Sequence, residues 1–218
     1  MRQALVSVHA ARDQTGPVMF EILTVCTGNI CRSPLAELLL RGRLADLEGH
    51  IHSAGTYGLD QVPMTTEAQR LATLNGVPAE TAAAHRSQPL DEALLSSPDL
   101  ILVMTREHRR QVLELAPSRM RAVFTLREFA RLAEAVTDDD LRAAAASAGT
   151  DPAKRLRAVA GTIAAHRGIV GAPSNPQDDD VIDPYRRSWN TYQLTAEQLV
   201  PTIDQVVRAV RIVHHSVG

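Results

Sequence analysis

Cysteine is scarce in this chain of 218 residues, which has only two, at positions 26 and 31. Two thiols so close together cannot build a disulfide framework, so a reducing, cytoplasmic setting is expected. Long hydrophobic runs are missing as well: no stretch approaches the roughly 20 apolar residues of a membrane span. Residues 1–17 lack the apolar core of a signal peptide. We therefore expect them to form a flexible extension, and we predict no insertion into a membrane.

The chain also lacks a large excess of charge of either sign. Its formal net charge is −2, so no overall basic field suggests nucleic acid as a partner. The eight histidines show no metal-ligand spacing along the sequence, so we expect neither a metal nor another cofactor. Hydrophobic residues make up 44% of the chain, which is enough for the core of a single domain over residues 18–218.

Apolar segments alternate along the chain in the manner of strands and helices. Four strands are predicted, at 20–25, 51–54, 100–104 and 122–125, and the unbroken apolar run at 100–104 is the clearest buried strand among them. Apolar residues at helical spacing predict helices at 35–47, 65–75, 90–95, 106–116, 127–136 and from 195 to the end. This alternation predicts an α/β fold, a four-stranded parallel sheet with helices on both faces.

Three local signals refine these helices. Ser33 is expected to cap the first of them, with Pro34 at its first helical position, and Gly49 to end it. A capping box beginning at Thr195 is expected to start the last helix.

The alanine-rich stretch before the last helix does not fit the alternation of strands and helices, and we interpret residues 137–177 as a helical insertion. Its helical part should end at about 171, with a flexible linker over 172–180.

The segment VCTGNICRSP, residues 25–34, leads from the first strand into the first helix, with Cys26 and Arg32 separated by five residues. Backbone N–H groups of such a loop, together with the helix dipole, form a nest for an anion. Arg32 offers two donors to a phosphate, and Cys26 is expected to be a thiolate that attacks phosphorus. A buried apolar cysteine is the alternative reading of Cys26 alone. The residues predicted to surround the phosphate are Thr27, Gly28, Asn29, Ile30, Cys31 and Ser33.

This loop resembles the signature of the low-molecular-weight protein tyrosine phosphatases. Segments resembling later parts of that family follow in the same order, namely SAGT at 53–56, HRS at 85–87 and DLILVM at 99–104. The resemblance covers about residues 20–136 and 178–213. It implies a flavodoxin-like, phosphotyrosine phosphatase I-like three-layer sandwich and a hydrolase that acts on phosphotyrosine through a phosphocysteine.

A leaving phenolate needs a proton, which a thiolate cannot give, so a carboxylic acid must lie over the loop. The candidates are the run at 178–180 and Asp183. The resemblance identifies Asp183, followed by Pro184 and Tyr185, as this acid, and the run at 178–180 is expected to face solvent. The DPYR context is similar to the bacterial branch that is paired with capsule or exopolysaccharide tyrosine kinases. A phosphotyrosine protein, with such an autokinase as one example, is therefore the implied partner.

The resemblance also implies supporting roles. Ser53 is expected to hydrogen-bond Asn29 of the loop, with a bond to its own backbone as the alternative. Tyr57 and Tyr185 are expected to form walls of the pocket.

Further residues near the loop receive structural readings from the sequence. His85 and His108 are interpreted as structural, and Tyr192 as packing the last helix. Cys31 could join Cys26 in a reversible disulfide under oxidation, or simply pack beneath the loop.

Three other functions stay open. An arsenate reductase of the same fold would need thiols outside the loop, and this chain has none, so an external thiol would have to serve. A protein-arginine phosphatase carries threonine at the position of Ile30. A non-catalytic phosphate-binding adaptor would not need Cys26, Arg32 and Asp183 together. The sequence leaves the oligomeric state and the physiological substrate undetermined.

Overall fold

The computed structural model describes residues 19–215, so the predicted extension over residues 1–17 lies outside the described part. No helix within 19–215 is long and apolar enough to cross a membrane. The elements are, in chain order, β1 (Phe20–Cys26), α1 (Arg32–Arg43), β2 (Gly49–Gly55), α2 (Thr66–Leu74), α3 (Ala79–Ala84), α4 (Glu92–Ser96), β3 (Leu100–Val103), α5 (Arg106–Leu115), η1 (Pro117–Arg119), β4 (Val123–Thr125), α6 (Leu126–Glu134), α7 (Asp138–Ser147), α8 (Pro152–Ala165), α9 (Arg167–Val170), η2 (Pro176–Asp179) and α10 (Trp189–His215).

The four predicted strands form one parallel sheet in the order β2-β1-β3-β4. The register runs from Phe20 opposite Gly49 to Cys26 opposite Gly55, and Ile22 of β1 faces Leu100 of β3. β1 is therefore a central strand, and the loop that follows Cys26 leaves the carboxyl end of the sheet. This is the edge at which parallel α/β sheets bind their ligands.

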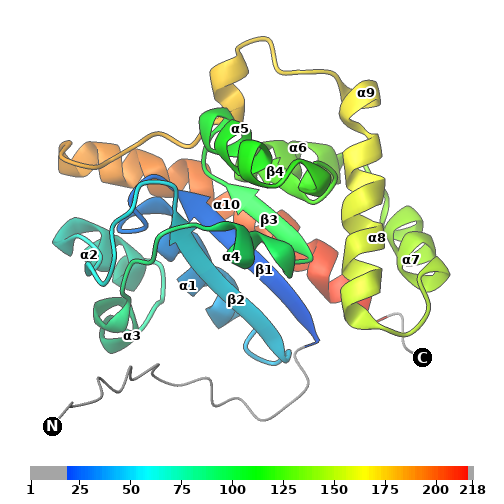
Figure 1. Ribbon diagram of the computed structural model, residues 1–218, viewed down its shortest axis with the longest axis horizontal. Helices are drawn as coiled ribbons and strands as arrows, with labels where there is room; N and C mark the ends of the chain where they lie inside the picture. Colours follow the sequence, from blue (N-terminus) through cyan, green and yellow to red (C-terminus); the bar gives the residue numbers. More distant parts are fainter. Residues whose placement is uncertain (1–18, 216–218) are drawn as a thin grey trace, which may run out of the picture.

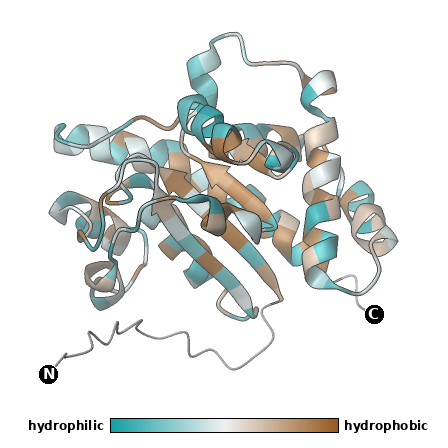
Figure 2. Cartoon of the chain, in the orientation of Figure 1, coloured by the Kyte–Doolittle hydropathy of each residue, from teal (hydrophilic) through white to brown (hydrophobic). Residues whose placement is uncertain are grey.

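Helices cover both faces of this sheet, as predicted. Residues of α1, α6 and α10 pack with Ile22, Leu102 and Phe124 in one hydrophobic cluster. Leu95 of α4 and Val112 of α5 pack against the opposite face. Figure 1 shows α4 in front of the strands and α10 passing behind them, and in Figure 2 β3 is strongly hydrophobic whereas the edge strand β2 carries hydrophilic residues as well. The predicted three-layer arrangement is confirmed.

Both predictions about the ends of α1 are wrong. The helix begins at Arg32, with Cys31 at the N-cap position, and no side chain caps it. The hydroxyl of Ser33 donates instead to Cys26 Sγ, at 3.0 Å. The helix ends at Arg43, and Gly49 is the first residue of β2. The helix therefore starts two residues before the position that a Ser33 cap predicts, Pro34 is its third residue rather than its first, and the Ser33 hydroxyl bonds to the sulfur.

The predicted start of the last helix is also wrong. α10 begins at Trp189, and Thr195 lies inside it. Its hydroxyl donates to the carbonyl of Thr191, one turn earlier, at 2.9 Å. A threonine can bond backwards in this way within a helix, so the capping-box pattern alone did not mark a helix start.

The stretch after α6 is helical, as expected. Its short helices α7 and α8 bury Leu141, Leu156 and Ile163, and both pack against α10. Residues 172–180 contain the 3-10 turn η2 rather than only linker.

The aspartate run at 178–180 is only partly solvent-facing. Asp178 is exposed as expected. Asp179 and Asp180 are not fully exposed and pair with Arg131 and Arg106, each at 2.9 Å, which corrects the prediction for these two residues.

Candidate active site

Cys26 lies at the end of β1 with only 2% of its surface exposed. Its sulfur accepts a hydrogen bond from Ser33 Oγ at 3.0 Å. The first turn of α1 has no side-chain cap, so its N–H groups remain suited to an anion bound in front of them. The loop thus presents a buried sulfur and an uncapped helix N-terminus together.

Arg32 links this loop to a distant segment. The guanidinium is buried, and Nη1 donates to the carbonyl of Val181 at 3.1 Å. Nη2 lies 2.8 Å from Asp183 Oδ2 and 3.4 Å from Thr27 Oγ1. Nε is buried without a hydrogen-bond partner among residues 19–215. A buried donor of this kind is costly unless an acceptor is supplied, and a phosphate oxygen would supply one.

Asn29 stabilises the loop through the hydrogen bonds of its side chain. Its φ of 53° lies in the left-handed region, which asparagine tolerates better than most residues. Its Nδ2 donates to Ser53 Oγ at 2.7 Å and to Ser33 Oγ at 3.0 Å, so the predicted contact with Ser53 is present. Its Oδ1 accepts from the backbone N–H of Gln88 at 3.0 Å. The loop conformation is therefore fixed by bonds to other segments.

A cavity of about 390 Å³ opens above the loop. Loop residues from Cys26 to Arg32 line its floor, and Tyr57, Asp183 and Tyr185 contribute its walls. Most of the residues predicted for the site therefore meet at one place. Asn29, Ser33 and Ser53 are absent from its lining, and their side chains support the loop from the other side.

The family model for low molecular weight phosphotyrosine protein phosphatases matches residues 21–140, more than half of the chain. The chain belongs to this family. The match includes the loop and its supports but ends before Asp183.

Named relatives agree with this membership. The low molecular weight protein-tyrosine-phosphatase Etp of Escherichia coli is 44% identical over 96 residues, which are 44% of this chain and 62% of Etp. The chain thus spans less than two thirds of that relative. The probable phosphatase EpsP of Ralstonia solanacearum is 38% identical over 49% of this chain and 70% of its own length. A protein-arginine-phosphatase of Bacillus subtilis is 36% identical over 50% and 71%, so phosphatases named for two different phosphoamino acids are similar to this chain.

Solved structures share the fold over more of the chain. The tyrosine phosphatase AmsI of Erwinia amylovora aligns with a TM-score of 0.60 and 24% identity, over 90% of this chain and 95% of AmsI. Vibrio vulnificus Wzb, solved with benzylphosphonate, aligns with a TM-score of 0.58 and 23% identity, over 86% and 97%. At these sequence identities, the similarity to the two solved structures supports the fold of this chain and nothing further.

Sequence reasoning missed several supports of this family loop. Ser53 Oγ donates to Glu37 Oε2 at 2.5 Å, so a buried carboxylate lies behind the serine that holds Asn29. A side chain on Gly55 would place its Cβ 2.7 Å from the carbonyl of Thr27, so glycine is needed where β2 meets the loop. Glu37 looks like the polar face of α1 in sequence, and only its 7% exposure reveals its role.

Two histidines contact the loop, in keeping with their structural reading. His85 Nε2 lies 2.9 Å from the carbonyl of Asn29. His108 bridges Thr27 Oγ1, at 2.9 Å from Nε2, and Thr105 Oγ1, at 2.8 Å from Nδ1. Burial and the nearby positive charge of Arg32 lower the pKa of His108 to about 4. The ring is therefore neutral at physiological pH and can donate from one nitrogen and accept at the other.

Cys31 faces away from solvent and packs beneath the loop. Its sulfur lies 3.6 Å from Thr65 Oγ1 and 3.8 Å from the hydroxyl of Tyr192, which is itself buried as predicted. Burial raises the pKa of Cys31 to about 11, so this thiol is uncharged at neutral pH. Both cysteines are free, and a reversible disulfide between them stays a prediction.

Proposed function

We propose that this protein is a phosphotyrosine-protein phosphatase that acts through a phosphocysteine intermediate. One observation carries the proposal. The sulfur of Cys26 and the guanidinium of Arg32, both from the loop, line one cavity with the carboxyl group of Asp183, which comes from a distant part of the sequence. Nucleophile, phosphate-binding cation and proton donor are the three groups that this reaction needs.

In the first step the thiolate of Cys26 attacks phosphorus. The S–P bond forms as the bond from phosphorus to the phenolic oxygen breaks, and the oxygen takes a proton from Asp183. The loop N–H groups and Arg32 stabilise the charge that spreads over the remaining phosphate oxygens. Asp183 Oδ2 lies 2.8 Å from Arg32 Nη2, so its carboxyl group is next to the cation that would bind the phosphate.

In the second step Asp183, now a carboxylate, removes a proton from water. The water oxygen attacks phosphorus, the S–P bond breaks, and inorganic phosphate leaves. The electron pair returns to the sulfur, where the hydroxyl of Ser33 hydrogen-bonds it at 3.0 Å. Asp183 keeps the proton that it took from the water, so the same step restores both the thiolate and the carboxylic acid.

The walls of the cavity favour phosphotyrosine as the substrate. Tyr57 and Tyr185 can pack against the two faces of a phenyl ring, an arrangement that aromatic side chains favour. Ile30 adds apolar surface at the floor, where a threonine would offer a hydroxyl. From the sequence resemblance we propose a tyrosine-phosphorylated protein as the partner, with an exopolysaccharide or capsule kinase as a candidate.

The test compares phosphotyrosine and phosphoarginine peptides of matched sequence, using wild type and Cys26→Ser. We expect turnover of the phosphotyrosine peptide by wild type and none by Cys26→Ser, whose circular dichroism spectrum should match that of wild type. Full turnover by Cys26→Ser would refute the mechanism. Preferential release of phosphate from phosphoarginine would keep the mechanism and change the substrate.

Arsenate reduction is the second function to test, because the same loop can bind arsenate. The chain offers no thiol outside the loop, so reduction would need an added thiol such as glutathione or thioredoxin. We expect no arsenite above background with either thiol under conditions in which the phosphotyrosine peptide is hydrolysed.

A further inference from the structure

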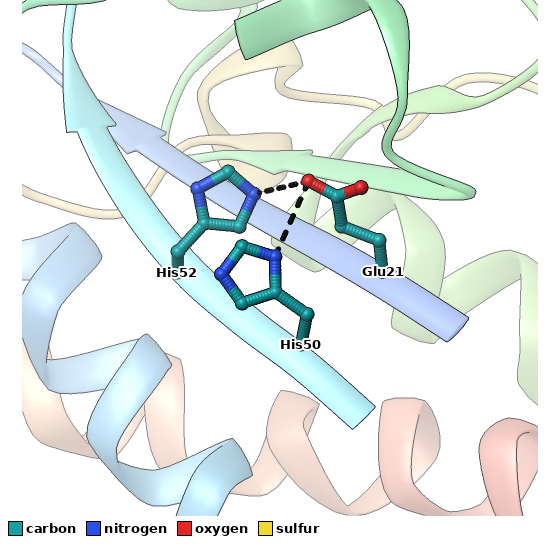
Figure 3. A group of neighbouring side chains, drawn as sticks. All are labelled: Glu21, His50 and His52. Atoms are coloured by element: carbon teal, nitrogen blue, oxygen red, sulfur yellow. Dashed lines mark ion pairs between the residues drawn. The ribbon is translucent and has the colours of Figure 1, made fainter. Parts of the chain in front are cut away.

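A glutamate and two histidines meet at the end of the sheet opposite to the loop. Glu21 is the second residue of β1, and the register places it opposite His50 on the edge strand β2. His52 follows two residues later, so its side chain lies on the same face of the sheet as that of His50. Figure 3 shows both imidazoles turned toward the carboxylate of Glu21.

The three side chains lie at distances close to those of a metal-ligand set. Glu21 Oε1 is 2.9 Å from His52 Nε2 and 3.5 Å from His50 Nδ1. The three ligand atoms all lie within 4.8 Å of one another, and the two rings stack with their centroids 4.5 Å apart. Two ligand atoms of a tetrahedral zinc ion, each about 2.1 Å from the metal, lie roughly 3.4 Å apart. Small side-chain movements would therefore bring these atoms to three corners of a tetrahedron.

The surroundings also suit a metal ion. The side chains of His52 and Glu21 are 11% and 17% exposed, so packing holds them, whereas that of His50 is 49% exposed and leaves a path from solvent. His52 Nε2 is buried, and despite its closeness to Glu21 it makes no well-aligned hydrogen bond within the part of the chain that the structure describes.

We propose that Glu21, His50 and His52 bind a divalent transition metal ion, for which Zn²⁺ is the best match, with water in the fourth position. Imidazole nitrogens with one carboxylate oxygen form a known type of zinc ligand set. Spacing along the chain does not reveal this site, because Glu21 lies on β1 and both histidines lie on β2. Glu21 is five residues before Cys26 on β1, roughly 16 Å at the rise of a strand, so the site is separate from the cavity above the loop. The ion would join β1 to β2, the two strands that lead to Cys26 and Ser53.

The test measures binding of Zn²⁺ alone by titration calorimetry. The Cys26→Ser protein serves as the parent, because a reactive thiolate would bind zinc independently. We expect one equivalent of Zn²⁺ to bind to the parent and the affinity to fall about 100-fold or more in Cys26→Ser/His50→Ala, since removing even an outer-shell partner costs 10–100-fold. The matched control is Cys26→Ser/His166→Ala, which removes a histidine outside the cluster and should bind as the parent does.

A second readout separates loss of the site from loss of the fold. At a hundredfold excess of Zn²⁺ over its dissociation constant, the melting temperature of the parent should rise by about 5 °C or more. The His50→Ala protein should melt near the parent's temperature without zinc, because His50 is largely exposed, and should show no rise with zinc. Equal binding by the parent and the His50→Ala variant, or no binding by the parent, would overturn the proposal.

Discussion

The loop after β1 and the segment that carries Asp183 contribute to one cavity but are held in different ways. Asn29 and Ser33 are completely buried, and their side chains bond to each other and to neighbouring segments. Asp183 has a side chain that is 51% exposed. Its segment is tied down at Val181, whose N–H donates to Met104, and at Ile182, whose N–H donates to Gln198 Oε1, each at 2.8 Å.

This difference follows the division of chemical labour that we propose. Stabilising a phosphate in the transition state requires donors fixed before the substrate arrives, which buried hydrogen bonds provide. A general acid must meet a leaving group and later a water molecule, so access from solvent is useful to it. Activity should therefore depend on the residues outside the loop that hydrogen-bond to it. In the segment that carries Asp183, which we call the acid segment, activity should depend on Asp183 itself.

The largest expected effect concerns the acid segment. Asp183→Asn keeps the size of the side chain and removes its proton, so kcat for a phosphotyrosine peptide should fall by about 10²–10⁴. For an aryl phosphate whose phenol is strongly acidic the loss should be much smaller, because that leaving group needs no proton. Steady-state kinetics with both substrates measure the contrast. The matched control is Asp178→Asn, an exposed neighbour of the same type that should change neither rate; an equal loss in both variants would remove Asp183 from this role.

The next effect concerns the supports of the loop. Ser53→Ala removes the hydroxyl that accepts from Asn29 and donates to the buried Glu37. We expect a loss of stability of about 1–3 kcal/mol, because two buried polar groups lose a partner, and a fall in kcat larger than any change in KM. Chemical denaturation and peptide kinetics measure the two effects. Ser96→Ala, at an exposed site, should alter neither; unchanged kcat in Ser53→Ala would show that the loop keeps its shape without this bond.

The third effect concerns the pH dependence of stability that arises from His108, whose ring contacts the loop. Burial and the charge of Arg32 lower the pKa of His108 from 6.5 to about 4 in the folded protein. The unfolded chain therefore takes up this proton first as pH falls, so the contribution of the neutral ring is complete above pH 6.5 and is lost between about 6.5 and 4. The full difference amounts to about 3 kcal/mol. Denaturant unfolding measures the free energy of unfolding at pH 7 and at pH 4. Between these two values wild type should lose about 3 kcal/mol more than His108→Gln. Equal losses in the two proteins would contradict the lowered pKa of His108.

The contrast between the two regions also decides what the sequence could predict. The loop motif and the buried strands are local patterns, so their positions were predicted to within one or two residues. Glu37 and Gln88 support the loop across long sequence separations, and nothing in their neighbourhoods along the chain marks them. Thr195 was wrongly predicted to start a helix. Its hydroxyl bonds to the carbonyl of Thr191, one turn earlier, because the helix has already begun there. Asp183 was chosen as the candidate acid, among the aspartates at 178–180 and 183, from the resemblance and from the Pro184 and Tyr185 that follow it.

The smallest effect concerns the wall on the acid segment. Tyr185 is 44% exposed and lines the cavity beside Asp183, so it should contact the ring of the substrate rather than stabilise the fold. Loss of one aromatic contact costs about 0.5–1.5 kcal/mol, so Tyr185→Ala should raise KM for a phosphotyrosine peptide roughly 2–10-fold with little change in kcat. Tyr185→Phe keeps the ring and should behave as wild type in peptide kinetics. A fall in kcat with unchanged KM would instead show that this side chain positions Asp183, and the acid segment would then be more ordered by its neighbours than its exposure indicates.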